Sequence, residues 1–173
     1  MRSEDFRIGW RATKITVPAA LSGITATVVV ATATVDNIVS RAAGSWIDDT
    51  VEIGDSITFT GFEGAANNVT FTVTKVEALA LYGTTAAAML AVAGDAGVGG
   101  LIGTRAVKLD RCRLGRIRVL TGAITITPYD DTVAMWDTVA STADLDFGDQ
   151  PLEITHSLKL LFSAAGSAWV HYK

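Results

Sequence analysis

Few side chains in this sequence have both the type and the spacing that enzyme chemistry requires. The two histidines, His156 and His171, show neither a His-x-x-x-His nor a His-x-Glu spacing, so no catalytic zinc site is expected. Cys112 lies among basic residues, which would lower the pKa of a thiol, but no catalytic signature surrounds it and we expect a small buried hydrophobic residue. The sequence has no Gly-x-Ser-x-Gly elbow and no Gly-Lys-Ser/Thr phosphate loop. We therefore predict no catalytic residue, no cofactor and no enzyme activity. A hydrolase with two carboxylates on facing strands is the remaining enzymatic alternative, and the sequence does not place such a pair.

One acidic segment has the residue types of a calcium site. Asp144, Asp146 and Asp149 lie around Gly148, and oxygen ligands at a glycine turn suit calcium. The strong calcium-binding loop has further ligands and ends in a bidentate glutamate, which this segment lacks. The three aspartates are therefore a weak candidate, and no metal is expected.

Charge is segregated along the second half of the chain. Six basic residues and one acid lie between Arg105 and Arg118, whereas seven acids and no base lie between Asp130 and Glu153. The candidate interface residues in these two segments are Arg105, Lys108, Arg111, Arg113, Arg116, Arg118, Asp130, Asp131, Asp144, Asp146 and Asp149.

A β-bulge at Gly115 would place four arginines on one face of a strand, with Leu114, Ile117, Val119 and Cys112 pointing inward. These arginines are Arg111, Arg113, Arg116 and Arg118. Three interpretations of this face remain open. It is a solvated strand face, or its arginines bind the acidic segment of the same or a neighbouring subunit, or it binds nucleic acid. Nucleic acid is not expected, because the chain is acidic and no aromatic residues are interleaved with the arginines.

Composition limits the class of protein. With 173 residues, 49% apolar and 18% charged, the chain is too hydrophobic for intrinsic disorder and large enough to bury a core without a metal or a disulfide. The net charge of -4 opposes attraction of the whole chain to nucleic acid. The longest stretch with few charged residues, 85–103, consists largely of Ala and Gly and carries Asp95, so no membrane span is expected. No secretory signal is recognised, and we expect synthesis in a cytoplasm.

Alternation of apolar and polar residues predicts β-strands. Residues 56–60 and 69–76 alternate with period two and form a predicted hairpin, and similar strands are predicted over 24–35 and 124–127. At the end of the chain, 158–162 and 168–172 are predicted to pair as a hairpin, with Trp169 and His171 on one face. The fold class is all-β, a sandwich or a barrel-like structure.

The domain organisation is predicted from a change in composition. Residues 1–83 form an N-terminal β module, the Ala/Gly-rich segment 84–104 forms a loop or a short helix, and residues 105–173 form a C-terminal β module. A single continuous sandwich is the equal alternative.

Part of the first module resembles a known type of domain. Arg41 is followed by Gly44-Ser45-Trp46, then by the acidic residues Asp48-Asp49 in a turn, then by Gly54-Asp55 at the start of a strand. Over residues 34–82 this pattern resembles a β module of tailed-bacteriophage virion proteins. The resemblance implies a role in a phage particle, in its head, tail or fibre.

On this basis we expect a structural subunit of a tailed-bacteriophage virion, first of all a capsid decoration (cement) or head-proximal protein. It would bind copies of itself and other virion proteins such as the major capsid protein. A tail-tube or neck subunit is the first alternative, and a carbohydrate-binding receptor module of a tail fibre, which requires an exposed tryptophan, is the second.

Overall fold

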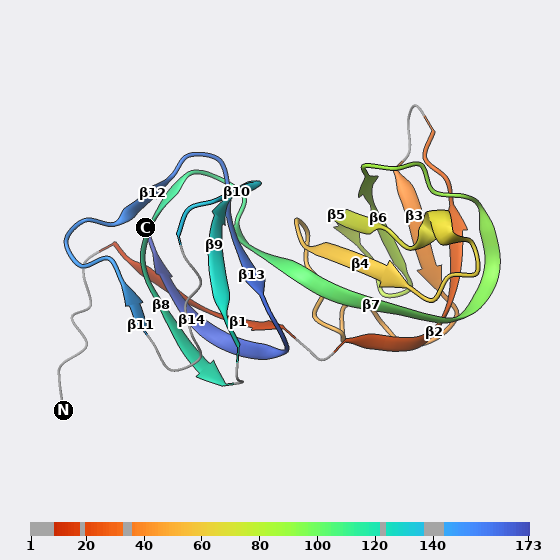
Figure 1. Ribbon diagram of the computed structural model, residues 1–173, viewed down its shortest axis with the longest axis horizontal. Helices are drawn as coiled ribbons and strands as arrows, with labels where there is room; N and C mark the ends of the chain where they lie inside the picture. Colours follow the sequence, from red (N-terminus) through yellow and green to blue (C-terminus); the bar gives the residue numbers. More distant parts are fainter. Residues whose placement is uncertain (1–8, 18–19, 33–35, 122–123, 137–143) are drawn as a thin grey trace. The chain divides into compact units, whose positions relative to one another are not determined.

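The protein is an all-β structure made of two compact units. The computed structural model describes residues 9–17, 20–32, 36–121, 124–136 and 144–173, with the backbone alone for Leu101 and Asp144. In this described part the one helical element is the 3-10 turn η1 (Ala65–Asn67), and no helix is long and apolar enough to cross a membrane. The predicted fold class is therefore confirmed, and it takes the form of a closed barrel with further sheets (Figure 1).

One unit is inserted into the other. The barrel unit consists of Val17–Ala106, and the split unit consists of Met1–Thr16 together with Val107–Lys173. This division differs from the predicted one, because the first strand of the chain belongs to the same sheet as the last. Pairing between strands so far apart in sequence leaves no local signal from which the insertion could be recognised.

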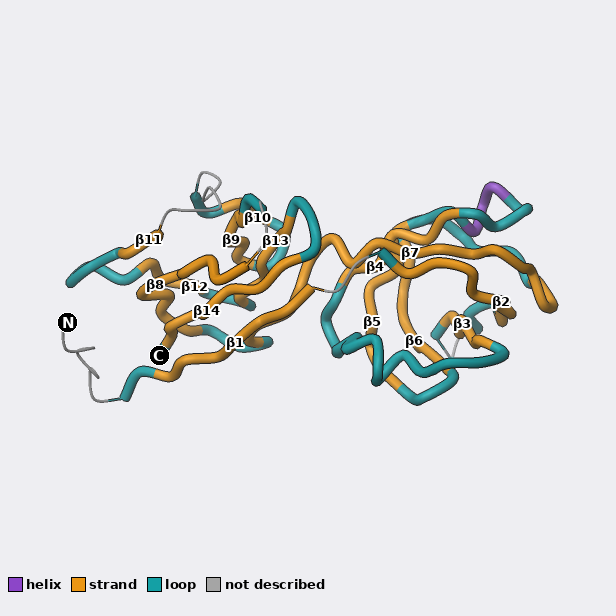
Figure 2. The backbone as a smooth tube through the Cα atoms, turned by 90° about the horizontal axis from the view of Figure 1, so that it is seen from below, coloured by secondary structure: helices purple, strands orange, loops and turns teal. Residues whose placement is uncertain are grey.

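Six strands close the barrel unit. Their order is β7-β2-β3-β6-β5-β4, and β4 pairs back onto β7, so the sheet has no free edge (Figure 2). The bounds are β2 (Leu21–Val29), β3 (Asn37–Arg41), β4 (Ser56–Thr60), β5 (Thr70–Val76), β6 (Ala80–Thr85) and β7 (Val92–Lys108). The β4–β5 hairpin predicted from alternation is confirmed.

Aromatic side chains fill the barrel. Phe59 is fully buried and makes edge-to-face contacts with three rings, those of Trp46, Phe62 and Phe71. Gly83 makes room for this cluster, because a Cβ there would lie 2.5 Å from Cε1 of Phe71. Such rings supply much of the apolar area that stabilises a small core.

The Ala/Gly-rich segment 84–104 forms strand rather than a loop or a short helix, apart from the connection between Thr85 and Val92. The register between β2 and β7 shifts three times, and Gly23, Gly94 and Gly97, all with positive φ, lie at these shifts. Glycine adopts positive φ without steric cost, and each bulge bends the strand. Gly94 and Gly97 therefore bend β7, and Gly23 bends β2, so that β7 can pair with both β2 and β4, which closing a six-stranded barrel requires.

The split unit contains the remaining strands in two sheets. One sheet has the order β1-β14-β8-β11, with β12 also paired to β8, and the other contains β10, β9 and β13 beside β7, whose last residues belong to this unit. The bounds are β1 (Arg11–Val17), β8 (Cys112–Thr121), β9 (Ile126–Asp130), β10 (Val133–Ala134), β11 (Asp144–Asp146), β12 (Leu152–Ile154), β13 (Leu158–Phe162) and β14 (Gly166–Tyr172).

The core of the split unit lies between its two sheets. Leu114, Ile117 and Val170 from one sheet and Leu158 and Leu160 from the other are fully buried. The predicted C-terminal hairpin is wrong, because β13 pairs with β9 and β14 pairs with β8 in the other sheet. The chain crosses between the layers at residues 163–165 instead of turning back within one sheet.

Candidate interaction surface

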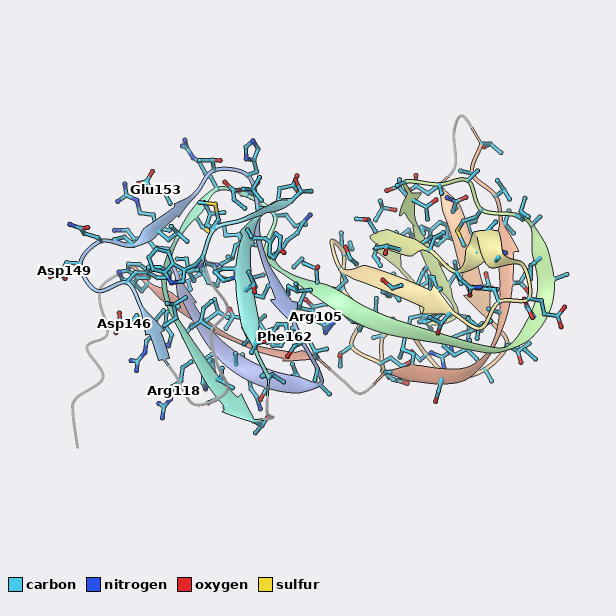
Figure 3. All side chains as sticks on the ribbon, in the orientation of Figure 1. Arg105, Arg118, Asp146, Asp149, Glu153 and Phe162 are labelled. Atoms are coloured by element: carbon cyan, nitrogen blue, oxygen red, sulfur yellow. The ribbon has the colours of Figure 1, made fainter. Side chains whose placement is uncertain are left out.

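The basic strand β8 lies beside the acidic strands of the same unit. In the register of β11 on β8, Asp144 is opposite Arg118 and Asp146 is opposite Arg116. In the register of β12, Glu153 is opposite Arg113, and Arg113 Nη2 lies 2.7 Å from Glu153 Oε1. Figure 3 labels Arg118, Asp146 and Glu153 on these neighbouring strands. The acidic segment therefore meets the arginines within one chain, which is one of the interpretations left open above.

The other neighbour of β8 adds an aromatic and basic column. Trp169 is opposite Arg118 and His171 is opposite Arg116. Lys173 exchanges two backbone hydrogen bonds of 3.0 Å with Arg113. The four strands β14, β8, β11 and β12, with Lys173 just after β14, thus carry three cross-strand rows, which we call the ladder face: Trp169–Arg118–Asp144, His171–Arg116–Asp146 and Lys173–Arg113–Glu153.

Most of the described side chains of the ladder face are exposed, whereas Arg116 and His171 are half-buried. Arg113, Arg118 and Glu153 are exposed and Trp169 is 37% exposed. The residues that alternate with them, Leu114, Ile117 and Val170, are buried. This alternation is the period-two pattern of a sheet with one face on the core and one in water.

A bulge at Gly115 holds the arginines in phase. Arg116 pairs with His171 and Leu114 pairs with Tyr172, so the register skips Gly115, as the spacing of the arginines predicted. A Cβ at this position would lie 2.4 Å from Cζ3 of Trp10, so the absence of a side chain also makes room for that indole. Gly115 therefore fixes both the face of the arginines and the packing of Trp10.

Arg105 does not belong to this surface, contrary to the sequence prediction. It is 3% exposed inside the barrel unit, where Arg105 Nη1 donates to Asp55 Oδ2 at 2.8 Å and Nη2 donates to the carbonyl of Thr50. Asp55 Oδ1 also accepts from the backbone N–H of Ala106 at 3.1 Å. Burial raises the pKa of the Asp55 carboxyl to about 6, and Arg105 offsets part of this rise. The pair is a buried structural contact near the end of β7.

Asp130 is likewise a structural residue rather than an interface residue. It is 7% exposed, and its carboxylate accepts hydrogen bonds from Thr155, His156 and Ser157. Burial opposes ionisation, but these bonds outweigh it and hold the pKa of Asp130 well below its usual range. Asp130 thus fixes the turn between β12 and β13. Its exposed neighbour Asp131 pairs with Lys159, with Oδ1 2.7 Å from Nζ.

The remaining candidates are spread over the split unit. Lys108 is half-buried, and Arg111 and Asp149 are exposed. Asp137, one of the seven acids, lies outside the described residues. Asp146 Oδ1 accepts from the backbone N–H of Gly148 at 2.8 Å, which closes a local turn. Among the described residues no three His, Cys, Asp or Glu side chains gather in a way that could hold an ion.

Cys112 is buried on the core side of β8. Burial raises the pKa of its thiol to about 11, although Lys108 acts in the opposite direction. A thiol with such a pKa is protonated near neutral pH and is a poor nucleophile.

The residues that carry the phage-module pattern form the turn between β3 and β4. The Arg41 guanidinium lies 4.8 Å from the centre of the Trp46 ring, and Arg41 Nη1 lies 2.5 Å from Asp49 Oδ2. Gly44 has a φ of 81°, and a Cβ there would collide with Arg41. Arg41, Trp46 and Asp49 thus hold this turn together.

Comparison of the chain with family models, with curated proteins and with solved structures finds no significant match. Functional inference therefore rests on the molecule itself. The ladder face combines the exposed indole of Trp169 and the exposed guanidinium of Arg118 with the half-buried imidazole of His171 and the exposed carboxylate of Glu153. Sequence reasoning missed the alignment of Trp169 with Arg118, because only the long-range pairing of β14 with β8 creates it.

Proposed function

We propose that this protein is a structural subunit of a tailed-bacteriophage virion, acting by binding copies of itself and neighbouring virion proteins. The position proposed first is that of a capsid decoration (cement) or head-proximal protein, with the major capsid protein as a partner. A tail-tube or neck position is the alternative within the same class.

The observation that carries a binding role is the ladder face. Trp and Arg are the residue types that contribute most to protein–protein interfaces, and here Trp169 is exposed directly beside Arg118. The face lies on paired strands rather than on long loops, so little conformational entropy is lost when a partner covers it. The link to a phage particle comes from the pattern around Arg41 and Trp46.

Three groups that could take part in catalysis, one thiol and two carboxylates, support a structural role, because each is buried or bound within the fold. The Cys112 thiol is buried with a raised pKa, the Asp55 carboxylate binds Arg105, and the Asp130 carboxylate binds a turn. The two carboxylates are thus engaged in contacts within the fold, and the thiol is buried.

The test is to look for the protein in purified particles of the phage that encodes it. Mass spectrometry gives the copy number per particle, and cryo-electron microscopy gives the position. A decoration protein is expected on the shell at a copy number set by the capsid lattice, and a tail-tube protein in stacked sixfold rings. Absence of the protein from washed, infectious particles would overturn the proposal.

A carbohydrate-binding receptor module is the second candidate, favoured by the exposure of Trp136 (52%) and Trp169 (37%). An exposed indole can stack on a sugar ring, with charged neighbours binding its hydroxyls. Titration with host surface polysaccharide should then shift the tryptophan fluorescence of the wild type and leave that of Trp169→Ala largely unchanged. No shift with the wild type would dismiss this candidate.

A further inference from the structure

The two units of the chain carry different charge. The barrel unit has eight acidic and three basic residues, a net charge of -5, whereas the split unit has ten acidic and eleven basic residues, a net charge of +1. The whole-chain charge of -4 therefore hides a strongly acidic unit joined to a slightly basic one.

Internal ion pairs account for every basic residue of the barrel unit. Arg41 pairs with Asp49, Lys75 with Glu77 and Arg105 with Asp55. The excess negative charge therefore lies on the other five acids of the unit, which are Asp36, Asp48, Glu52, Glu63 and Asp95.

Two of these acids lie in one short surface turn. Asp48 and Glu52 are both exposed in residues 47–53, which we call the acidic turn. Ile47 at its start is 57% exposed and Ile53 at its end is 49% exposed. Isoleucines so exposed beside carboxylates form a small amphipathic patch of the kind found at protein interfaces.

Backbone hydrogen bonds hold the acidic turn in one conformation. Thr50 N–H donates to the Ile47 carbonyl at 2.9 Å and Val51 N–H donates to the Trp46 carbonyl at 3.0 Å. Glu52 N–H donates to Asp55 Oδ2 at 2.9 Å, which connects the turn to the buried ion pair. A preorganised turn loses little entropy on binding.

The ladder face has the complementary chemistry. Its acids lie on β11 and β12, at one side of the arginines. On the other side, the column of Trp169 and His171 on β14 and Lys173 just after it has arginines in register and no acid. The next strand, β1, adds the exposed Lys14. From β1 to β8 the face is therefore basic and aromatic.

We propose that copies of this chain associate head to tail, with the acidic turn of one copy on the β14–β8 part of the ladder face of the next. Asp48 and Glu52 meet the basic column, and Ile47 and Ile53 pack beside Trp169. This inference rests on the proposed function, which it deepens by naming the partner and both surfaces. Since two different surfaces meet, the contact is heterologous and builds rings or filaments rather than closed twofold dimers.

The experiment is sedimentation velocity of the full-length chain over a range of protein concentrations, at low and at high salt. Wild type should form oligomers that dissociate at high salt, because exposed charges are screened. Arg118→Glu on the face and Asp48→Lys on the turn should each weaken association by about tenfold or more. Trp169→Ala should weaken it without changing the charge. Arg111→Glu and Glu63→Lys, exposed charge changes outside both surfaces, are the matched controls and should associate as wild type does.

A mixture of the two charge variants makes the test specific. Arg118→Glu retains its acidic turn and Asp48→Lys retains its ladder face, so an equimolar mixture can form the intact contact and should give at least dimers, which neither variant forms alone. Recovery of dimers also shows that both variants are folded. An isologous, face-to-face contact would instead leave Asp48→Lys fully associated, and that result would overturn the proposal.

Two further results would also overturn it. One is a wild type that sediments as a monomer at every concentration. The other is binding of a single-stranded oligonucleotide that Arg118→Glu abolishes, in a wild type that does not self-associate. A monomer in solution that is still found in purified particles would remove this inference and leave the proposed function standing.

Discussion

The Asp55 carboxylate and the Arg105 guanidinium form an ion pair of 2.8 Å with exposures of 0% and 3%. Desolvation offsets much of the attraction in such a pair, but removing one partner leaves an uncompensated buried charge. The pair also connects the residue just before β4 to β7, and the pairing of these two strands closes the barrel.

Arg105→Met should therefore destabilise the barrel unit by about 3–5 kcal/mol. Urea unfolding gives the free energy, and hydrogen exchange of β4 and β7 peptides assigns the loss to this unit. The double variant Asp55→Asn/Arg105→Met should regain part of the loss, since it leaves no buried charge. The exposed Arg111→Met is the control, with an expected change of at most about 0.5 kcal/mol. Equal stabilities of Arg105→Met and Arg111→Met would show that the pair has no such role.

Gly115→Ala should destabilise the split unit by about 1–3 kcal/mol, because the new Cβ would lie 2.4 Å from the Trp10 ring. The same methyl group should displace the indole and change the tryptophan fluorescence spectrum. Gly64→Ala is a suitable control, since a Cβ there meets its nearest atom at 3.8 Å. An unchanged spectrum with unchanged stability would contradict the packing of Trp10 on this bulge.

Local patterns in the sequence are sufficient to predict several strands and the position of one β-bulge. Alternation located β4 and β5, and the one-residue phase change between Arg113 and Arg116 located the Gly115 bulge. Alternation of apolar and polar residues also places Trp169 and His171 on one face of their strand. These signals are local because side chains alternate along each strand regardless of what the strand pairs with.

Features that depend on contacts between residues far apart in the sequence cannot be predicted from local patterns. Nothing local in the sequence separates Arg105 from the surface arginines, because its partner, Asp55, is 50 positions away along the chain. The glycines of β7 do not distinguish a strand from a loop, because a bulged strand and a loop use the same residue. The rows of the ladder face need the registers of β14, β11 and β12 on β8, which no single segment encodes.

The stability of the split unit should decrease in acid because of Asp130. Its pKa is lower in the folded protein than the ordinary value of 3.8, so the ionised carboxylate contributes stability that is complete above that value. The contribution is lost as the pH falls below 3.8 toward the folded pKa, since the unfolded chain then binds a proton that the folded chain does not.

Asp130→Asn should accordingly lower the free energy of unfolding by about 2 kcal/mol at neutral pH and flatten its dependence between about pH 5 and pH 3. Urea unfolding across this pH range measures both effects. The exposed Asp110→Asn is the control and should keep the steeper acid dependence. Parallel pH profiles for wild type and Asp130→Asn would contradict the role assigned to the turn.

Cys112 should resist thiol reagents in the folded protein. Its burial and its pKa of about 11 leave little thiolate at pH 8, and the thiolate is the reactive form. Reaction with a disulfide reagent at pH 8 should therefore be at least about a hundredfold slower than in urea, where the thiol regains an ordinary pKa. Cys112→Ser is the blank that identifies the signal, since this chain has a single cysteine. A rate equal to that of the unfolded chain would show that the thiol is accessible and ionised, and would make Cys112 a candidate nucleophile.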